Sequence, residues 1–182
     1  MSGSWDPGVA KETEEAIKFL VHKIEESGKN TKPVILHSLR VGLYLQKGEY
    51  TSEVVIAGFL HDLLEDSDTS FEEISQRFGK RVAELVLANS FDKTVKDDKK
   101  RYEQTFQRGM KVGKDALLIK AADILDNSYY YPLVKDKKTY DWLIEGKLKY
   151  FIENTKEIIG EEKVWKELNG RIDKLGRVRF DS

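Results

Sequence analysis

The chain has 182 residues, a length that fits one domain with a sizeable core. Its 31 Lys and Arg residues nearly balance 32 Asp and Glu residues, so a formal net charge of -1 gives no reason to expect nucleic acid or a membrane as partner. It has no cysteine, which excludes disulfides, zinc–thiolate sites and thiol catalysis. No signal-like start is present, and no apolar run approaches the ~20 residues of a membrane span. We expect a soluble, cytoplasmic globular protein.

Apolar residues recur at helical spacing along most of the chain. The helices predicted in chain order cover residues 9–27, 34–46, 52–66, 71–78, 81–89, 114–131, 139–159 and 161–168. Several of their ends carry turn or capping residues: Gly28, Pro33, a Ser70–Glu73 capping box, Gly79 and Pro132.

The remaining segments are predicted to lie outside helices. Residues 92–100 form a charged stretch that we place on the solvated surface, and Gly109 and Gly113 bracket a connection. Residues 170–182 are predicted to be a loose tail. The expected fold class is all-α, with a single helical domain over residues 1–182 and a core over about 9–169.

The most informative segment is His-Asp-Leu-Leu-Glu-Asp at 61–66, which directly follows an apolar run. On a continuous helix each residue turns ~100°, so His61, Asp62, Glu65 and Asp66 would share one side. Polar groups beside an apolar run need partners if they are buried, and a metal ion suits an imidazole with several carboxylates. The alternative for the last two acids is exposure at a helix end, which the helix dipole disfavours.

The other two histidines differ in their surroundings. His22 lies on the first predicted helix with nothing nearby to complete a site, so we interpret it as an ordinary satisfied or exposed histidine. His37 starts an apolar helix 24 residues before His61. Alone it would be a core histidine more often than a ligand, but a neighbouring antiparallel helix would bring it to His61.

A fourth ligand is expected from another buried helix. Asp123 interrupts an apolar run and is costly there unless it is paired or metal-bound. A buried salt bridge to Arg40 or Lys120 is the alternative. Asn127 lies four residues later on the same helix face, where it could hydrogen-bond a ribose or a base.

Two imidazoles and two carboxylates form a mixed nitrogen and oxygen set. Such a set suits Mn²⁺, Fe²⁺, Co²⁺ or Zn²⁺, and Mn²⁺ is reasonable where waters fill open positions. A bound ion would lower the pKa of its water and polarise a phosphoryl oxygen. Glu65 or Asp66 would then orient or deprotonate the attacking water, and the other would assist protonation of the leaving group.

These residues resemble the signature of the HD-domain phosphohydrolases, and more narrowly that of the RelA/SpoT-type (p)ppGpp hydrolases. The run 61–70 is similar to His-Asp-x-x-Glu-Asp-(Thr/Ser)-Asp-(Thr/Val)-(Ser/Thr) in that family. The run 118–127 resembles Val-Lys-Leu-Ala-Asp-(Arg/Lys)-Leu-x-Asn. The likeness extends over roughly residues 10–160, close to a whole small alarmone hydrolase.

The resemblance implies an all-α HD-domain fold that binds one Mn²⁺ ion and acts on (p)ppGpp. Lys93 lies in the charged stretch, where a lysine could face a phosphate. The expected site residues are the metal ligands His37, His61, Asp62 and Asp123, the catalytic pair Glu65 and Asp66, and the substrate-binding residues Asn127, Lys29, Lys32 and Lys93.

The chain also departs from the family pattern. Relatives usually carry an Arg-Lys pair shortly before a Pro-Tyr-x-x-His motif. Here Pro33 is kept, Val34 replaces the tyrosine, and Lys29 or Lys32 is the candidate substitute for the missing pair. Ile124 stands where the family has a basic residue. These changes alter nucleotide recognition and leave the metal and catalytic set intact.

We therefore expect a metal-dependent phosphohydrolase in which a metal-bound water attacks the 3′-diphosphate of a guanosine nucleotide. One alternative is an HD-domain phosphohydrolase of another nucleotide or deoxynucleotide. A second is a non-catalytic nucleotide-binding module on a retired hydrolase scaffold. In each case the partner is a small nucleotide.

Overall fold

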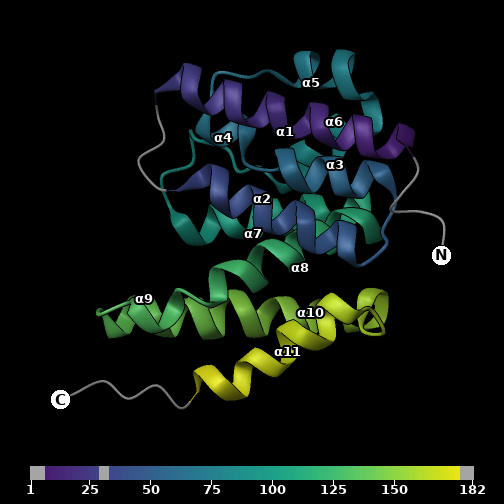
Figure 1. Ribbon diagram of the computed structural model, residues 1–182. Helices are drawn as coiled ribbons and strands as arrows, with labels where there is room; N and C mark the ends of the chain where they lie inside the picture. Colours follow the sequence, from purple (N-terminus) through teal and green to yellow (C-terminus); the bar gives the residue numbers. More distant parts are fainter. Residues whose placement is uncertain (1–6, 29–32, 177–182) are drawn as a thin grey trace. The chain divides into compact units, whose positions relative to one another are not determined.

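The computed structural model describes residues 7–28 and 33–176, and within them the regular structure is helical, without strands (Figure 1). The prediction of an all-α chain is confirmed. The chain divides into two compact units, Met1–Ile119 and Lys120–Ser182, with the boundary inside helix α8 (Lys114–Ser128). A single domain over residues 1–182 stays a prediction. In the described part of the chain, no helix is both long and apolar enough to cross a membrane.

Seven helices precede α8 in the described part of the first unit. They are α1 (Pro7–Ser27), α2 (Val34–Lys47), α3 (Ser52–Leu60), α4 (Leu63–Asp66), α5 (Phe71–Phe78), α6 (Lys80–Asn89) and α7 (Asp98–Val112). Helix α3 is central, because it packs against α1, α2 and α6 (Figure 1). Its residues 54–60 are all buried. The apolar run before His61 therefore lies in the core of this unit.

Helices α2 and α3 approach closely at two glycines. A Cβ atom built on Gly42 would overlap the ring of Phe59. A Cβ atom on Gly58 would lie 2.5 Å from Cδ1 of Leu45. Since side chains larger than hydrogen would push the helices apart, these glycines set the separation between the two helices that carry the histidines.

The local end signals predicted for α1, α5 and α6 are present. Gly28 and Gly79 have φ angles of 61° and 90°, which favour glycine. The Ser70 side chain accepts a hydrogen bond from the backbone N–H of Glu73 at 3.1 Å, as the capping box predicts. These three helices begin and end within two residues of their predicted limits.

Two predictions for the first unit are wrong. Helix α7 was not predicted, and Gly109 lies inside it, whereas Gly113 with φ 98° follows its end. The predicted helix over 52–66 is broken: α3 ends at Leu60 and α4 starts at Leu63. Asp62 has ψ near -7°, and its carbonyl oxygen accepts the N–H groups of Glu65 and Asp66, so a new helix begins there.

In the second unit, α8 ends at Ser128 instead of the predicted residue 131. The predicted helix over 139–159 is a succession of three segments with a π-helical middle. The elements are η1 (Tyr131–Leu133), α9 (Lys137–Asp141), η2 (Trp142–Lys149), α10 (Tyr150–Ile159) and α11 (Lys163–Leu175). In the π-helix, the Trp142 ring fills the space where a Cβ atom of residue 146 would lie, so glycine is required there.

The predicted tail from residue 170 is wrong up to residue 175, because α11 continues through Leu175. Leu175 is buried, and its carbonyl oxygen accepts the Tyr140 hydroxyl at 2.7 Å. Apolar contact and a hydrogen bond thus extend the helix beyond its predicted end at 168. Residues 177–182 lie outside the described part of the chain.

Candidate functional site

His61 follows α3 directly, and only 1% of its surface is exposed. Its Nδ1 atom lies 2.9 Å from the carbonyl oxygen of Gly58. Because a carbonyl oxygen only accepts, Nδ1 carries the proton of the neutral ring and Nε2 keeps a lone pair. Metal-binding histidines are commonly fixed in this way by a hydrogen bond from the second ring nitrogen.

His37 lies in the first turn of α2 and faces His61. The two Nε2 atoms are 3.2 Å apart, and the rings meet edge to face at 70°. Asp62 completes the cluster: its Oδ1 lies 3.3 Å from Nε2 of His61, and its Oδ2 lies 3.8 Å from Nε2 of His37. Three of the predicted metal-site residues therefore converge within the first unit.

Glu65 and Asp66 are half-buried at the adjoining helix α4. The Oε1 atom of Glu65 accepts the backbone N–H of Phe91 at 2.8 Å. The carbonyl oxygen of Asp66 accepts the hydroxyl of Ser27, from the end of α1, at 3.3 Å. The segment that carries both acids is thus tied to two other parts of the first unit.

Asp123 lies in the second unit with two polar neighbours. The Nζ atom of Lys120 is 3.0 Å from Oδ2, and the amide of Asn127 donates to Oδ1 at 2.6 Å. The ion pair with Lys120 is the alternative that the sequence left open. Asn127, predicted to contact substrate, contacts this carboxylate. Tyr131 is buried nearby, and burial, followed by the negative charge of Asp123, raises the pKa of its hydroxyl.

The remaining candidates are placed as follows. Lys93 is exposed between α6 and α7. Lys29 and Lys32 lie outside the described residues. The His22 side chain is 70% exposed and lies 3.8 Å from Glu26, so its interpretation as an ordinary exposed histidine is confirmed.

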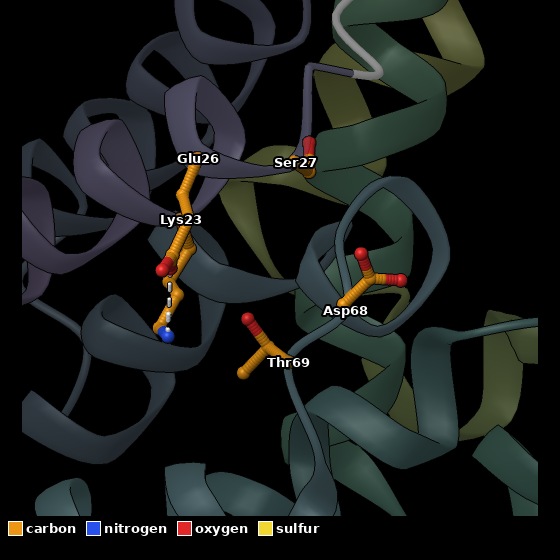
Figure 2. A pocket seen from close by; sticks show the side chains of 5 residues that line it. All are labelled: Lys23, Glu26, Ser27, Asp68 and Thr69. Carbon is orange, nitrogen blue, oxygen red and sulfur yellow. Dashed lines mark hydrogen bonds and ion pairs between the residues drawn. The ribbon is translucent and has the colours of Figure 1, made fainter.

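A pocket of about 260 Å³ opens between α1 and the loop before α5 in the first unit (Figure 2). Its lining residues are Lys23, Glu26, Ser27, Asp68 and Thr69. Lys23 pairs with Glu26 at 3.1 Å and with Glu73 at 2.8 Å. Sequence reasoning did not select this pocket, because its walls come from α1 and the loop before α5.

Sequence reasoning also missed the Phe91 contact to Glu65. The donor is a backbone group, which every residue except proline carries, so no residue type marks it. The only feature near Phe91 that the sequence marked was the charged stretch over residues 92–100, which does not predict a contact with Glu65.

Comparisons with known proteins identify the family of this chain. A family model described as HD domain matches residues 16–134. The chain belongs to the HD domain family.

Named relatives lie within that family. The chain is 37% identical over 124 residues to a guanosine-3′,5′-bis(diphosphate) 3′-pyrophosphohydrolase of Aquifex aeolicus (strain VF5), covering 66% of this chain and 18% of that protein. It is 38% identical over 97 residues to the enzyme so named in Danio rerio, covering 52% of this chain and 53% of that protein. The chain thus spans less than two thirds of each of these relatives.

Two solved structures share the fold. A structure described as a metazoan ortholog of SpoT that hydrolyzes ppGpp aligns with a TM-score of 0.72 at 24% identity, covering 91% of this chain and 94% of that one. A Listeria monocytogenes EGD-e protein aligns with a TM-score of 0.67 at 25% identity, covering 76% of this chain and 94% of that one.

Proposed function

We propose that this protein is a divalent-metal-dependent phosphohydrolase that removes the 3′-diphosphate of ppGpp or pppGpp. The observation that carries the proposal is the pair of imidazole nitrogens of His37 and His61, 3.2 Å apart and both directed at Asp62. The names of the relatives supply the substrate class. A cytoplasmic location is part of the proposal and agrees with the absence of cysteine.

The donor set fits a metal ion. His61 has its proton on Nδ1, so its Nε2 lone pair is available on the side of His37 and Asp62. We propose that these three residues and Asp123 hold the ion, with Mn²⁺ suited to such a nitrogen and oxygen set. When bound, the ion would lower the pKa of a water molecule and stabilise the charge that develops on the phosphoryl oxygens.

Glu65 and Asp66 carry the proton transfers in this proposal. One carboxylate orients the attacking water and takes its proton while the new oxygen–phosphorus bond forms. The bond between phosphorus and the ribose 3′ oxygen breaks, and the other carboxyl group gives that oxygen a proton. The products are pyrophosphate and a nucleotide with a free 3′ hydroxyl. Phe91 holds the Glu65 carboxylate through its backbone N–H.

Substrate contacts are proposed for Asn127, Lys29, Lys32 and Lys93. The amide of Asn127 has two N–H donors, and one of them reaches Asp123. The second could serve a ribose or a base. The three lysines would neutralise phosphate charge.

The test is a hydrolysis assay on metal-stripped protein resupplied with Mn²⁺, using ppGpp, pppGpp and deoxynucleoside triphosphates. We expect pyrophosphate release from ppGpp, lost in a Glu65→Ala/Asp66→Ala variant. The matched control is Glu72→Ala, because Glu72 is exposed on α5 and lies outside the site. Turnover of deoxynucleotides alone would select the alternative HD-domain hydrolase. Tight ppGpp binding without turnover of any nucleotide would select the binding module.

A further inference from the structure

Arg108 of α7 holds the end of α6. Its Nη1 atom lies 2.7 Å from the carbonyl oxygens of both Leu87 and Ser90. Carbonyls at a helix C-terminus lack intrahelical partners, so a guanidinium is a suitable donor to them. This contact alone would be a helix cap.

The Ser90 carbonyl belongs to the same peptide group as the Phe91 N–H. The described chain has no cis peptide bond, so this oxygen and this hydrogen point in opposite directions within the peptide plane. The oxygen faces Arg108 at 2.7 Å, and the N–H faces Oε1 of Glu65 at 2.8 Å. One rigid peptide group therefore connects the guanidinium to the proposed catalytic carboxylate.

Both hydrogen bonds of this peptide group involve a charged partner. A cation at the oxygen polarises the peptide and makes its N–H a stronger donor to the carboxylate on the other side. The Phe91 ring is also held, because the guanidinium of Arg101 lies 4.6 Å from its centre. The segment after α6 is thus fixed from α7 at two points.

We infer that Arg108 is a positioning residue for Glu65 and acts through the Ser90–Phe91 peptide group. The inference rests on the proposed function, because it assigns Arg108 to the reaction in which Glu65 handles the proton. In this role Arg108 fixes the direction of the Glu65 carboxylate and acts on the reaction only through that carboxylate. Its loss should therefore lower kcat and leave KM nearly unchanged.

The experiment compares Arg108→Ala with Arg81→Ala. Arg81 is an arginine of α6 that pairs with Asp115 at 2.6 Å. The control therefore removes the same charge and volume at a position that does not contact the Ser90–Phe91 peptide group. We expect Arg108→Ala to lower kcat for ppGpp about tenfold with KM within about twofold, and Arg108→Lys to recover part of kcat. Arg81→Ala should keep wild-type kcat. Amide exchange at Phe91 should accelerate in Arg108→Ala only.

A second pair of variants tests the peptide itself. Phe91→Pro removes the N–H, and the ψ of 143° at Ser90 is compatible with a following proline. Phe91→Ala keeps the N–H and removes only the ring. We expect a larger fall in kcat in Phe91→Pro than in Phe91→Ala, which keeps the N–H, and no further fall when Arg108→Ala is added to Phe91→Pro.

The outcomes separate the two claims. Undiminished kcat in Arg108→Ala, or additive losses in the double variant, would overturn the role of Arg108 and leave the proposed function intact. A wild-type protein that hydrolyses no ppGpp would overturn the proposed function. In that case the Phe91 amide exchange still reports whether Arg108 holds the peptide group.

Discussion

The Nε2 atoms of His37 and His61 face each other at 3.2 Å across the ends of two neighbouring helices. Because Gly58 fixes the proton of His61 on Nδ1, the His61 Nε2 atom is an acceptor. His37 then donates an Nε2 proton in this contact. If His37 and His61 held a cation, both Nε2 atoms would present lone pairs to it, and neutral His37 would carry its proton on Nδ1. Metal binding would then be coupled to the tautomer of His37.

The first prediction concerns metal affinity. His61→Ala removes a proposed ligand and should weaken Mn²⁺ binding by more than about 100-fold. Even residues that only hydrogen-bond a metal ligand typically contribute about 10- to 100-fold to metal affinity. Calorimetric titration of metal-stripped protein measures the affinity. His22→Ala is the matched control, because His22 is exposed on α1. Equal Mn²⁺ affinity in His61→Ala and wild type would remove His61 from the metal site.

The second prediction concerns the contact between α2 and α3. Gly42→Ala places a Cβ atom into the Phe59 ring, and overpacking of this kind typically costs ~1–3 kcal/mol. Gly170→Ala is the control, because a Cβ atom there meets nothing within 4 Å on α11. It should instead stabilise the helix by up to ~1 kcal/mol. Urea unfolding of both variants measures the difference. Unchanged stability in Gly42→Ala would show that the two helices separate at little cost.

Local signals explain which helices could be predicted. The ends of α1, α5 and α6 are set by glycines and by the Ser70 cap, which act within a few residues. Helix α7 escaped prediction because its sequence is mostly polar. It forms through the Asp97 cap, which accepts the Lys100 N–H at 2.9 Å, and through the packing of α7 on α6. That packing is a long-range contact without a local signature.

The candidate site, too, could be predicted from the sequence only in part. Its side-chain types and their order were readable, because imidazoles and carboxylates beside apolar runs need partners. The break after Leu60 was not readable, since 52–66 has no proline or other helix breaker at that point. The bond from Phe91 to Glu65 was hidden for a different reason: the donor is backbone, and it is supplied by a loop 26 residues away.

The third prediction concerns alkaline pH. Burial, and then the charge of Asp123, raise the pKa of Tyr131 above its usual value near 10. The unfolded chain releases this proton near pH 10, while the folded chain keeps it. The stability contribution is therefore complete below about pH 10 and falls as pH rises further. Tyr131→Phe should flatten this fall in urea unfolding between about pH 9 and pH 11. Tyr129→Phe, at an exposed position, should retain the wild-type slope.

The fourth prediction separates the two roles open to Asp123. Its carboxylate pairs with Lys120 at 3.0 Å and accepts from Asn127 at 2.6 Å. If Asp123 is a metal ligand, Asp123→Asn should abolish high-affinity Mn²⁺ binding and hydrolysis together. Lys120→Met removes the ion-pair partner and leaves the carboxylate, so Mn²⁺ binding should persist.

If Asp123 serves only to neutralise Lys120, the pattern reverses. Asp123→Asn would then leave an uncompensated, partly buried ammonium and lower the unfolding free energy while Mn²⁺ affinity stays at the wild-type value. Calorimetric Mn²⁺ titration and urea unfolding on both variants distinguish the cases, because the two roles place the larger loss in different measurements. We expect the larger loss of Asp123→Asn in the metal titration, since a carboxylate within an apolar helix is better compensated by a divalent ion than by one lysine.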